Sequence, residues 1–421
     1  MSKLLYLLPF AFFLVLIPNL SFTPWPEMLS RPFLLMHGWL PYKDIVMEHS
    51  PLLLYDLAIW FKLLGVGIFQ LKLFTISVIF INSLLILFYL NKSKTILIGL
   101  AVAIFYLLLC LGFEGFGIWF DLGLTPIILI VFLLTDKKWY FLAGLTFGLA
   151  LLVKQSAVYF IVPILFSVPL IRKNIFSLFI GIGSILLTAI IVFYLAGFLP
   201  EFLKYATGYP AGIQLPTPFQ LIYFAPFILL LLPVLPLKLK LWTFFGALGI
   251  FPRWGLFHLQ PALPFLAILF GFYLSLSNHK ISKVLYLALI SVFLYRQIHQ
   301  IWQMPDRFSE NSFLEAANYV KENTEESDKI LVLNTWESLY ALADRLPASK
   351  PLFPYLPWYL DKSETQTLIV SGLKSSPPVL VIRGELQESG LGAYQPEHIV
   401  NYVSQNYFPA VKIDSIHVLK K

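Results

Sequence analysis

Long apolar stretches separated by short polar turns fill the first three quarters of the chain. Most are roughly 15–22 residues long, which is the length an α-helix needs to cross a bilayer. They lie near residues 4–20, 69–90, 95–112, 119–135, 139–153, 157–171, 176–196, 217–236, 241–256, 259–277 and 283–301. The pattern therefore predicts a polytopic α-helical membrane protein with about eleven transmembrane helices.

One polar stretch, at residues 21–68, is much longer than the other turns, and we interpret it as a large first outer loop. Its segment 24–56, PWPEMLSRPFLLMHGWLPYKDIVMEHSPLLLYD, gathers ionisable side chains in an otherwise apolar chain. Such charges are costly near a membrane and usually line a pocket or a water-filled cavity. Residues 50–65 are apolar on one helical face, which predicts an amphipathic helix in the plane of the interface. The loop is thus predicted to form the floor and wall of an active site.

After residue 305 the pattern changes to the polar–apolar alternation of a soluble domain. Residues 306–421 hold 15 of the 23 acidic residues. Helices are predicted at 312–323, 336–345 and 396–407, and strands at 329–334, 378–384 and 412–420. The sequence therefore divides into a membrane domain, 1–305, and a small C-terminal α/β domain, 306–421.

Composition and charge support a membrane protein and suggest its orientation. The chain is 58% hydrophobic and 13% charged, whereas soluble domains carry about 25% charged residues. Eleven Lys and Arg fall on one predicted side, at Lys3 and in 91–94, 136–138, 171–174, 237–240 and 278–283. Basic loops mark the cytoplasmic face, so the N-terminus is predicted inside and the C-terminal domain outside. This bias accounts for the net charge of +7 without a nucleic-acid partner, and the single Cys110 allows no disulfide within the chain.

The acidic residues have the opposite bias. Of the eight acids before residue 305, only Asp136 falls on the predicted cytoplasmic side; the others are Glu27, Asp44, Glu48, Asp56, Glu114, Asp121 and Glu201. The cations Lys154 and Arg253, with His258, also fall at predicted outer helix ends. A carboxylate can take the proton of an acceptor hydroxyl, and cations can neutralise a departing phosphate. This set suits sugar transfer from a lipid-phosphate donor whose polyprenyl tail lies among apolar helices.

Each of these residues also has a structural interpretation. Outer loops need solvating groups, and Glu27 and Asp44 could cap interfacial helices. Asp121 could simply begin its helix, Lys154 and Arg253 could reach lipid headgroups, and His258 could be an ordinary interfacial histidine. The sequence has no phosphate-binding loop, no dinucleotide-binding motif and no HExxH motif, and no residues at metal-ligand spacing, so no metal site is predicted.

Several segments in order along the chain resemble the GT-C superfamily of membrane glycosyltransferases. The resemblance is to the bacterial branch related to protein O-mannosyltransferases and to the aminoarabinose transferase of lipid A. Its residues are GWLPYKDIVMEHSPLLLYDLAIWFKLLG (38–65), DLGLTPIILIVFLL (121–134), YFLAGLTFGLALLVKQSAVYFIVPIL (140–165), HLQPALPFLAIL (258–269), AANYVKENTEESDKILVL (316–333) and LYALADRLPAS (339–349).

The resemblance implies inverting transfer of a sugar from a polyprenyl-phosphate donor to a glycan, lipid or protein acceptor at the outer membrane face. It places the catalytic acid in the first outer loop. Relatives carry an Asp-Glu pair there, represented here only by Glu27, so Glu27 and then Asp44 are the expected bases. Glu48, Asp121, Lys154 and His258 would face donor or acceptor, with Arg253 added from its location. The resemblance leaves a divalent cation open as a cofactor.

Two other functions remain compatible with the residues themselves. A transporter or flippase of lipid-linked sugars would place its ionisable groups near the bilayer midplane on broken helices. A non-catalytic envelope-assembly protein would work through its C-terminal domain. The clustering of ionisable groups at the predicted outer edge favours chemistry at the interface.

Overall fold

The computed structural model of this chain describes residues 8–17, 20–90, 96–207, 213–276, 279–304, 306–307, 311–354, 356–384 and 396–421. It forms two compact units. The helical unit contains residues 1–23, 72–192 and 212–305, and the mixed unit contains 24–71, 193–211 and 306–421. The predicted first outer loop is thus grouped with the C-terminal region, and the predicted division at residue 305 stays a prediction.

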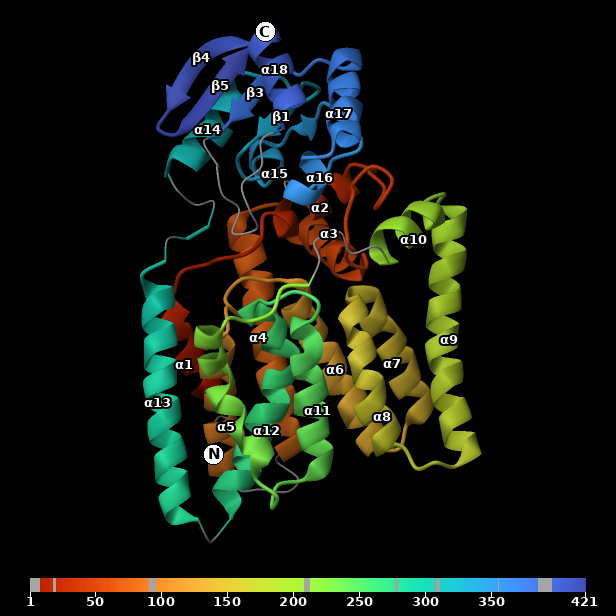
Figure 1. The fold of residues 1–421 in the computed structure, drawn as a ribbon, viewed down its shortest axis with the longest axis vertical. Helices are drawn as coiled ribbons and strands as arrows, with labels where there is room; N and C mark the ends of the chain where they lie inside the picture. Colours follow the sequence, from red (N-terminus) through yellow and green to blue (C-terminus); the bar gives the residue numbers. More distant parts are fainter. Residues whose placement is uncertain are drawn as a thin grey trace. The chain divides into compact units, whose positions relative to one another are not determined.

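The helical unit is built from α-helices and shorter 3₁₀ segments (Figure 1). Each of the eleven predicted apolar runs overlaps helical structure among the described residues. The elements are α1 (Leu8–Leu16), α4 (Ile68–Leu90), α5 (Ile96–Gly112), α6 (Phe120–Asp136), α7 (Tyr140–Val153), η3 (Gln155–Phe160), α8 (Ile161–Ser167), α9 (Arg172–Leu195), η4 (Pro218–Leu231), α11 (Leu237–Ala247), η5 (Leu248–Ile250), η6 (Leu256–Ala262), α12 (Leu263–Ser275) and α13 (Lys280–Trp302). Lys3, residues 91–94 and Asn278, which entered the charge argument, lie outside the described residues.

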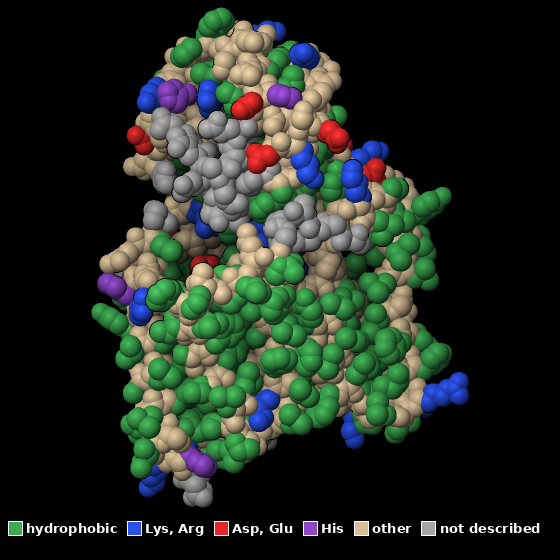
Figure 2. Space-filling model, viewed as in Figure 1, with side chains coloured by type: hydrophobic (Ala, Val, Ile, Leu, Met, Phe, Trp, Pro, Cys, Tyr) green, Lys and Arg blue, Asp and Glu red, His purple; other side chains and the backbone are tan. Residues whose placement is uncertain are grey.

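Four of the described helical segments are long and apolar enough to cross a membrane. They are Ile68–Leu90, Arg172–Leu195, Leu256–Ser275 and Lys280–Trp302. Figure 2 shows a broad field of hydrophobic side chains over the helices, with basic side chains mainly at its margins. The protein is therefore a mostly helical, multi-pass membrane protein; the count of eleven spans and the orientation stay predictions.

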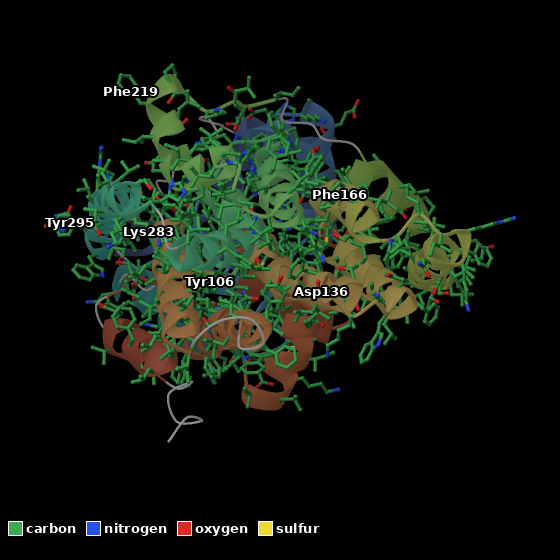
Figure 3. The ribbon with its side chains drawn as sticks, turned by 90° about the horizontal axis from the view of Figure 1, so that it is seen from below. Tyr106, Asp136, Phe166, Phe219, Lys283 and Tyr295 are labelled. Carbon is green, nitrogen blue, oxygen red and sulfur yellow. The ribbon has the colours of Figure 1, made fainter. Side chains whose placement is uncertain are left out.

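Tight packing between helices uses small residues and aromatic rings. A Cβ added to Gly181 of α9 would lie 2.3 Å from the carbonyl oxygen of Phe141 in α7, so only glycine permits this approach. Inside the unit the phenol of Tyr106 accepts a hydrogen bond from Asn82 at 2.9 Å. Figure 3 shows Tyr106 among the helices, while Phe219 and Tyr295 project outward. The buried phenol of Tyr106 is thus paired inside the unit, while the rings of Phe219 and Tyr295 face the surroundings.

The mixed unit contains a five-stranded sheet in the order β2-β1-β3-β5-β4. Strand β1 pairs in parallel with β2 and β3, whereas β5 is antiparallel to β3 and β4. The elements are α2 (Glu27–Met36), α3 (Leu52–Leu64), α10 (Leu199–Thr207), α14 (Asn311–Glu322), β1 (Lys329–Leu333), α15 (Leu339–Ala343), β2 (Leu346–Pro347), α16 (Pro357–Leu360), α17 (Ser363–Ser375), β3 (Leu380–Arg383), α18 (Glu397–Asn406), β4 (Phe408–Ile413) and β5 (Ile416–Lys420).

Most predicted elements of the C-terminal region are present, and the structure corrects the others. The single strand predicted at 412–420 is wrong, because a turn at Asp414, in the left-handed region at φ 51°, folds the chain into the hairpin of β4 and β5. The helix predicted at 336–345 is reduced to α15, and β2, α16 and α17 were not predicted. The predicted helix at 50–65 is α3, which buries Leu57 and leaves Ile59 and Leu63 exposed.

The first loop is joined by its backbone to the segment around Leu352, which follows strand β2. The N–H of Val46 donates to the carbonyl of Leu352 at 2.8 Å, and the N–H of Leu352 donates to the carbonyl of Asp44 at 2.8 Å. The Val46 side chain is buried in the same hydrophobic cluster as Leu331 and Val381 of the sheet. These contacts hold residues 44–46 as an added extended segment of the mixed unit.

Candidate functional site

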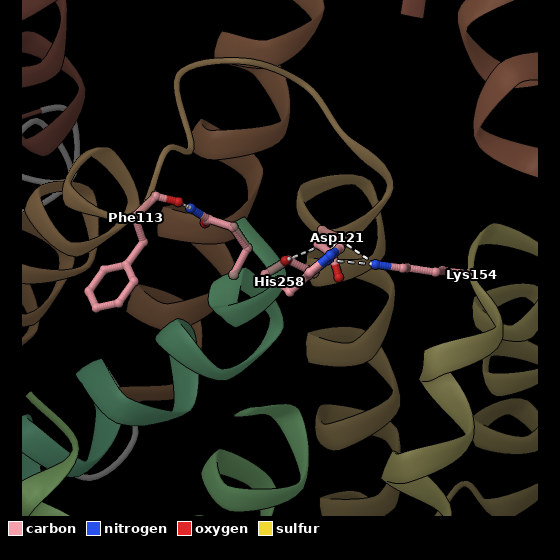
Figure 4. A network of polar contacts seen from close by, with 6 residues as sticks. Phe113, Asp121, Lys154 and His258 are labelled. Atoms are coloured by element: carbon pink, nitrogen blue, oxygen red, sulfur yellow. Dashed lines mark hydrogen bonds and ion pairs between the residues drawn. The ribbon is translucent and has the colours of Figure 1, made fainter. Parts of the chain in front are cut away.

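Three ionisable side chains that the sequence analysis singled out meet inside the helical unit. Lys154 Nζ lies 2.5 Å from Asp121 Oδ2 and 2.9 Å from His258 Nδ1, and His258 Nδ1 lies 2.8 Å from Asp121 Oδ2. Figure 4 shows the three side chains converging from separate elements. The structure therefore brings Asp121, Lys154 and His258 into one cluster, which we call the charged trio.

Local helix ends place each member of the trio. Asp121 lies in the first turn of α6, where a negative charge complements the positive end of the helix dipole. Lys154 directly follows the last residue of α7, where a positive charge is favoured, and its extended backbone starts the break before η3. His258 lies in the 3₁₀ segment η6, which also contains Pro261.

The trio is buried, so its charges must compensate one another. The exposed fractions are 0% for Asp121, 5% for Lys154 and 7% for His258. Asp121 Oδ2 has two lone pairs, which can accept the Lys154 ammonium and the N–H at His258 Nδ1 together. In that tautomer His258 Nε2 carries a lone pair. Asp121 Oδ1 is also buried and has no hydrogen-bond partner among the described residues, so it remains able to accept another donor.

The segment around His258 is fixed by neighbouring contacts. Gln260 Nε2 donates to the carbonyls of Cys110 and Phe113, at 3.0 and 2.6 Å, and so ties η6 to the end of α5. A Cβ added at Gly249 would lie 2.7 Å from the His258 carbonyl oxygen. Arg253 is half-buried, its backbone pairs with Gln214, and its charge acts electrostatically on His258. Arg253 is thus a neighbour of the charged trio rather than a member of it.

A second buried charge cluster lies in the mixed unit, around Arg31 of α2. Arg31 NH2 is 3.7 Å from Glu27 Oε1, and Arg31 Nε is 3.5 Å from Glu337 Oε1. Ser30 Oγ also donates to Glu337 Oε1 at 2.7 Å. Arg31 and Glu337 are 2% and 3% exposed, and Glu27 is 14% exposed. We call Glu27, Ser30, Arg31 and Glu337 the arginine cluster.

Burial and neighbouring charge set the protonation of this cluster. Burial raises the pKa of Glu337 to about 7; the Arg31 charge opposes that rise and the Glu27 charge adds to it. Burial alone would lower the pKa of Arg31, but the carboxylates around it, Glu337 first, raise that pKa above its usual value. The guanidinium therefore stays charged while Glu337 can exchange a proton near neutral pH.

The other two acids predicted from the first loop have different surroundings. Asp44 Oδ2 accepts the backbone N–H of Leu40 at 2.9 Å and pairs with Lys350 Nζ at 3.1 Å, so it closes a local turn rather than capping a helix. Glu48 is half-buried and its charge acts on Arg31 and on Tyr359. Burial, with the charge of Glu48, raises the pKa of Tyr359. Glu48 therefore neighbours the arginine cluster, and Asp44 does not join it.

The sequence analysis did not assign a site role to Ser30, Arg31 or Glu337. Arg31 follows Glu27 by four residues, which is the spacing of an ion pair on one helix face. That spacing was a usable signal. No comparable spacing pointed to Glu337. It lies 307 residues from Ser30 in the sequence, and the two side chains meet only in the folded protein. Among the described residues, no group of three or more His, Cys, Asp or Glu side chains is arranged to hold a metal ion.

Comparisons with known proteins give a likeness in structure. No protein-family model matches the sequence, and no curated protein matches it. Among solved structures, ArnT from Cupriavidus metallidurans bound to undecaprenyl phosphate has a TM-score of 0.61 at 11% identity, over 98% of this chain and 97% of that one. Its apo state has a TM-score of 0.63 at 13% identity over the same shares.

The chain has the GT-C fold. The resemblance predicted from the sequence is thereby confirmed as a likeness of fold that extends over nearly the whole chain. The oligosaccharyltransferase of Archaeoglobus fulgidus, tethered with an acceptor peptide containing the NVT sequon, has a TM-score of 0.50 at 12% identity. That match covers 96% of this chain and 70% of the other.

Proposed function

We propose that this GT-C-fold protein is a membrane glycosyltransferase. It moves a hexose or pentose from a polyprenyl-phosphate donor to a glycan, lipid or protein of the cell envelope, at the outer membrane face and with inversion. The observation that carries the proposal is the near-complete structural match to ArnT, which was solved bound to undecaprenyl phosphate. The two buried charge clusters supply groups of the kind this chemistry requires.

The proposal assigns the donor phosphate to the charged trio. Lys154 has three N–H donors, and Asp121 and His258 engage at most two of them. The third can meet a phosphate oxygen, and burial strengthens that attraction because little water screens it. Arg253 would add positive charge, and Glu48 would contact the acceptor. Asp121 holds Lys154 in place before the donor arrives.

Glu27 is the proposed general base, ahead of Asp44. Glu27 Oε2 is buried without a hydrogen-bond partner among the described residues, so a lone pair is free to take a proton. Asp44 Oδ2 is already engaged by Leu40 and Lys350. In the proposed step the acceptor oxygen attacks the anomeric carbon, and the bond from that carbon to the phosphate oxygen breaks. The acceptor proton passes to Glu27, and polyprenyl phosphate leaves.

A transporter of lipid-linked sugars is the second candidate, and one observation favours it. Lys154 stands at the break between α7 and η3, and His258 lies in the 3₁₀ segment η6. Ionisable groups on interrupted helices are typical of transporter binding sites. Such a protein would move a labelled lipid-linked sugar between leaflets of a liposome without forming a new glycosidic bond.

The test uses the purified full chain in liposomes with radiolabelled undecaprenyl-phosphate hexoses and pentoses and an envelope extract as acceptor. Label should move to envelope material, and Glu27→Gln should abolish transfer while a photoreactive undecaprenyl phosphate still labels the protein. Glu315→Gln, which removes an exposed acid of α14, is the matched control and should keep wild-type turnover. Flipping without transfer, unaffected by Glu27→Gln, would support the transporter instead.

A further inference from the structure

We propose that a pocket in the helical unit binds the headgroup of an anionic phospholipid. The pocket has a volume of about 730 Å³, within the range of about 300–1,000 Å³ found for ligand pockets. We call it the basic pocket; it is lined by Lys138, Trp139, Tyr140, Phe141, Leu142, Pro169, Ile171, Lys173, Asn174 and Ser177. None of these residues belongs to the charged trio, and the site is independent of the proposed sugar transfer.

The lining carries positive charge that nothing nearby neutralises. Lys138 and Lys173 are exposed, and neither side chain has an ion-pair or hydrogen-bond partner among the described residues. No acidic residue lines the pocket. Asp136, two residues before Lys138, is engaged by Lys238 Nζ at 3.0 Å. An anionic group would therefore meet two available ammonium groups, and Asn174 and Ser177 add hydrogen-bonding side chains.

Two helices also begin at this pocket. Helix α7 starts at Tyr140, and α9 starts at Arg172, next to Lys173. The first N–H groups of a helix have no partner within it, and its dipole is positive at that end. These features add to the attraction that Lys138 and Lys173 exert on an anion.

The apolar part of the lining indicates a lipid rather than a free ion. Trp139 and Ile171 are 53% and 60% exposed, and Phe141 and Leu142 are 42% and 45% exposed. Trp and Tyr gather where a membrane meets water, which is the level of the headgroups. The turns 136–138 and 171–174 belong to the predicted cytoplasmic side, where anionic lipids make the surface negative. A molecule with both phosphate and acyl chains matches this combination.

Native mass spectrometry of the full chain with phosphatidylglycerol or phosphatidylcholine tests the proposal. Wild-type protein should retain phosphatidylglycerol preferentially. The double variant Lys138→Gln/Lys173→Gln should weaken that binding about 30-fold, because each lysine near an anionic lipid is worth about fivefold in affinity. Lys138→Arg/Lys173→Arg keeps the charges and should retain the lipid. Brominated phosphatidylglycerol should quench tryptophan emission less in Trp139→Phe than in wild type.

The matched control is Lys280→Gln/Lys374→Gln, which removes two exposed charges outside the pocket and should leave lipid binding unchanged. The proposal is overturned if both lipids bind equally or if the control double variant loses as much affinity. Displacement of phosphatidylglycerol by an equal concentration of inorganic phosphate would also overturn it, because the site would then be one for a free anion. Equal thermal midpoints among the variants would show that a loss of folding does not cause the difference in lipid binding.

Discussion

Arg31 Nε lies 3.5 Å from Glu337 Oε1, and both side chains are almost completely buried. This pair joins helix α2 of the first loop to the segment before α15 in the C-terminal region. An arginine buried in this way must keep its carboxylate partners, because an unpaired buried charge is strongly destabilising. Since Glu27 contacts the same guanidinium, the pair also holds the proposed base in position.

The raised pKa of Glu337 predicts how stability depends on pH. The pKa is about 7 in the folded protein, against 4.5 for an ordinary glutamate, so the folded state binds more protons between these values. Stability should therefore fall as pH rises from about 4.5 to 7, by on the order of 3 kcal/mol. Thermal unfolding in detergent across this range measures the slope. Glu337→Gln should flatten it; an unchanged slope in that variant would show that another group titrates.

Removing the charge of Arg31 should destabilise the mixed unit. In Arg31→Met, the buried carboxylates of Glu27 and Glu337 lose their cation, at a cost of about 3–5 kcal/mol. The double variant Arg31→Met/Glu337→Gln should recover part of this loss, because it also removes a carboxylate left without its partner. Thermal midpoints of the two single variants and the double variant give the coupling energy. Strictly additive losses would argue against a direct interaction.

The charged trio should show the same coupling in the helical unit. Lys154→Met leaves the Asp121 carboxylate buried without its cation and should lower the free energy of unfolding by about 3–5 kcal/mol. Asp121→Asn leaves the Lys154 ammonium group buried without its carboxylate and should have a similar cost. Combining the two changes should cost less than their sum. Protease resistance in detergent follows stability, and binding of undecaprenyl phosphate should fall in every variant that lacks Lys154. Lys154→Met with wild-type stability and lipid binding would refute both roles.

Two glycines of α9 provide a matched test of helix packing. Gly181→Ala should cost about 1–3 kcal/mol, because its Cβ would come within 2.3 Å of the Phe141 carbonyl and force α7 away. Gly183→Ala, two residues further, meets nothing within 4 Å and should be neutral or slightly stabilising, since alanine favours helix. Thermal midpoints compare the two. Equal effects would show that the contact between α7 and α9 is loose.

Reporter fusions test the predicted orientation. A phosphatase fused after Lys421 should be active, because the basic turns predict that the C-terminal region lies outside the cytoplasm. A fluorescent protein that matures only in the cytoplasm should remain dark at the same position. Fluorescence there, with an inactive phosphatase, would contradict the predicted combination of a cytoplasmic N-terminus and an odd number of spans.

The sequence by itself determined the membrane class, the apolar helices and most elements of the C-terminal region. Apolar run length and polar alternation are local properties, so they can be read without knowing which segments meet. They also placed Asp121 and Lys154 at helix ends. The sequence missed α17, and it missed the turn at Asp414, where the pairing of β4 with β5 determines the outcome.

Only the tertiary structure decided which charges meet. Lys154 and His258 are 104 residues apart, and Ser30 and Glu337 are 307 residues apart, so no local pattern relates them. Folding separated Asp44 from the arginine cluster and added Glu337 to it. Burial and neighbouring charge then fixed the chemistry: carboxylates that look alike in sequence differ once Asp44 pairs with the exposed Lys350 and Glu337 is enclosed beside Arg31.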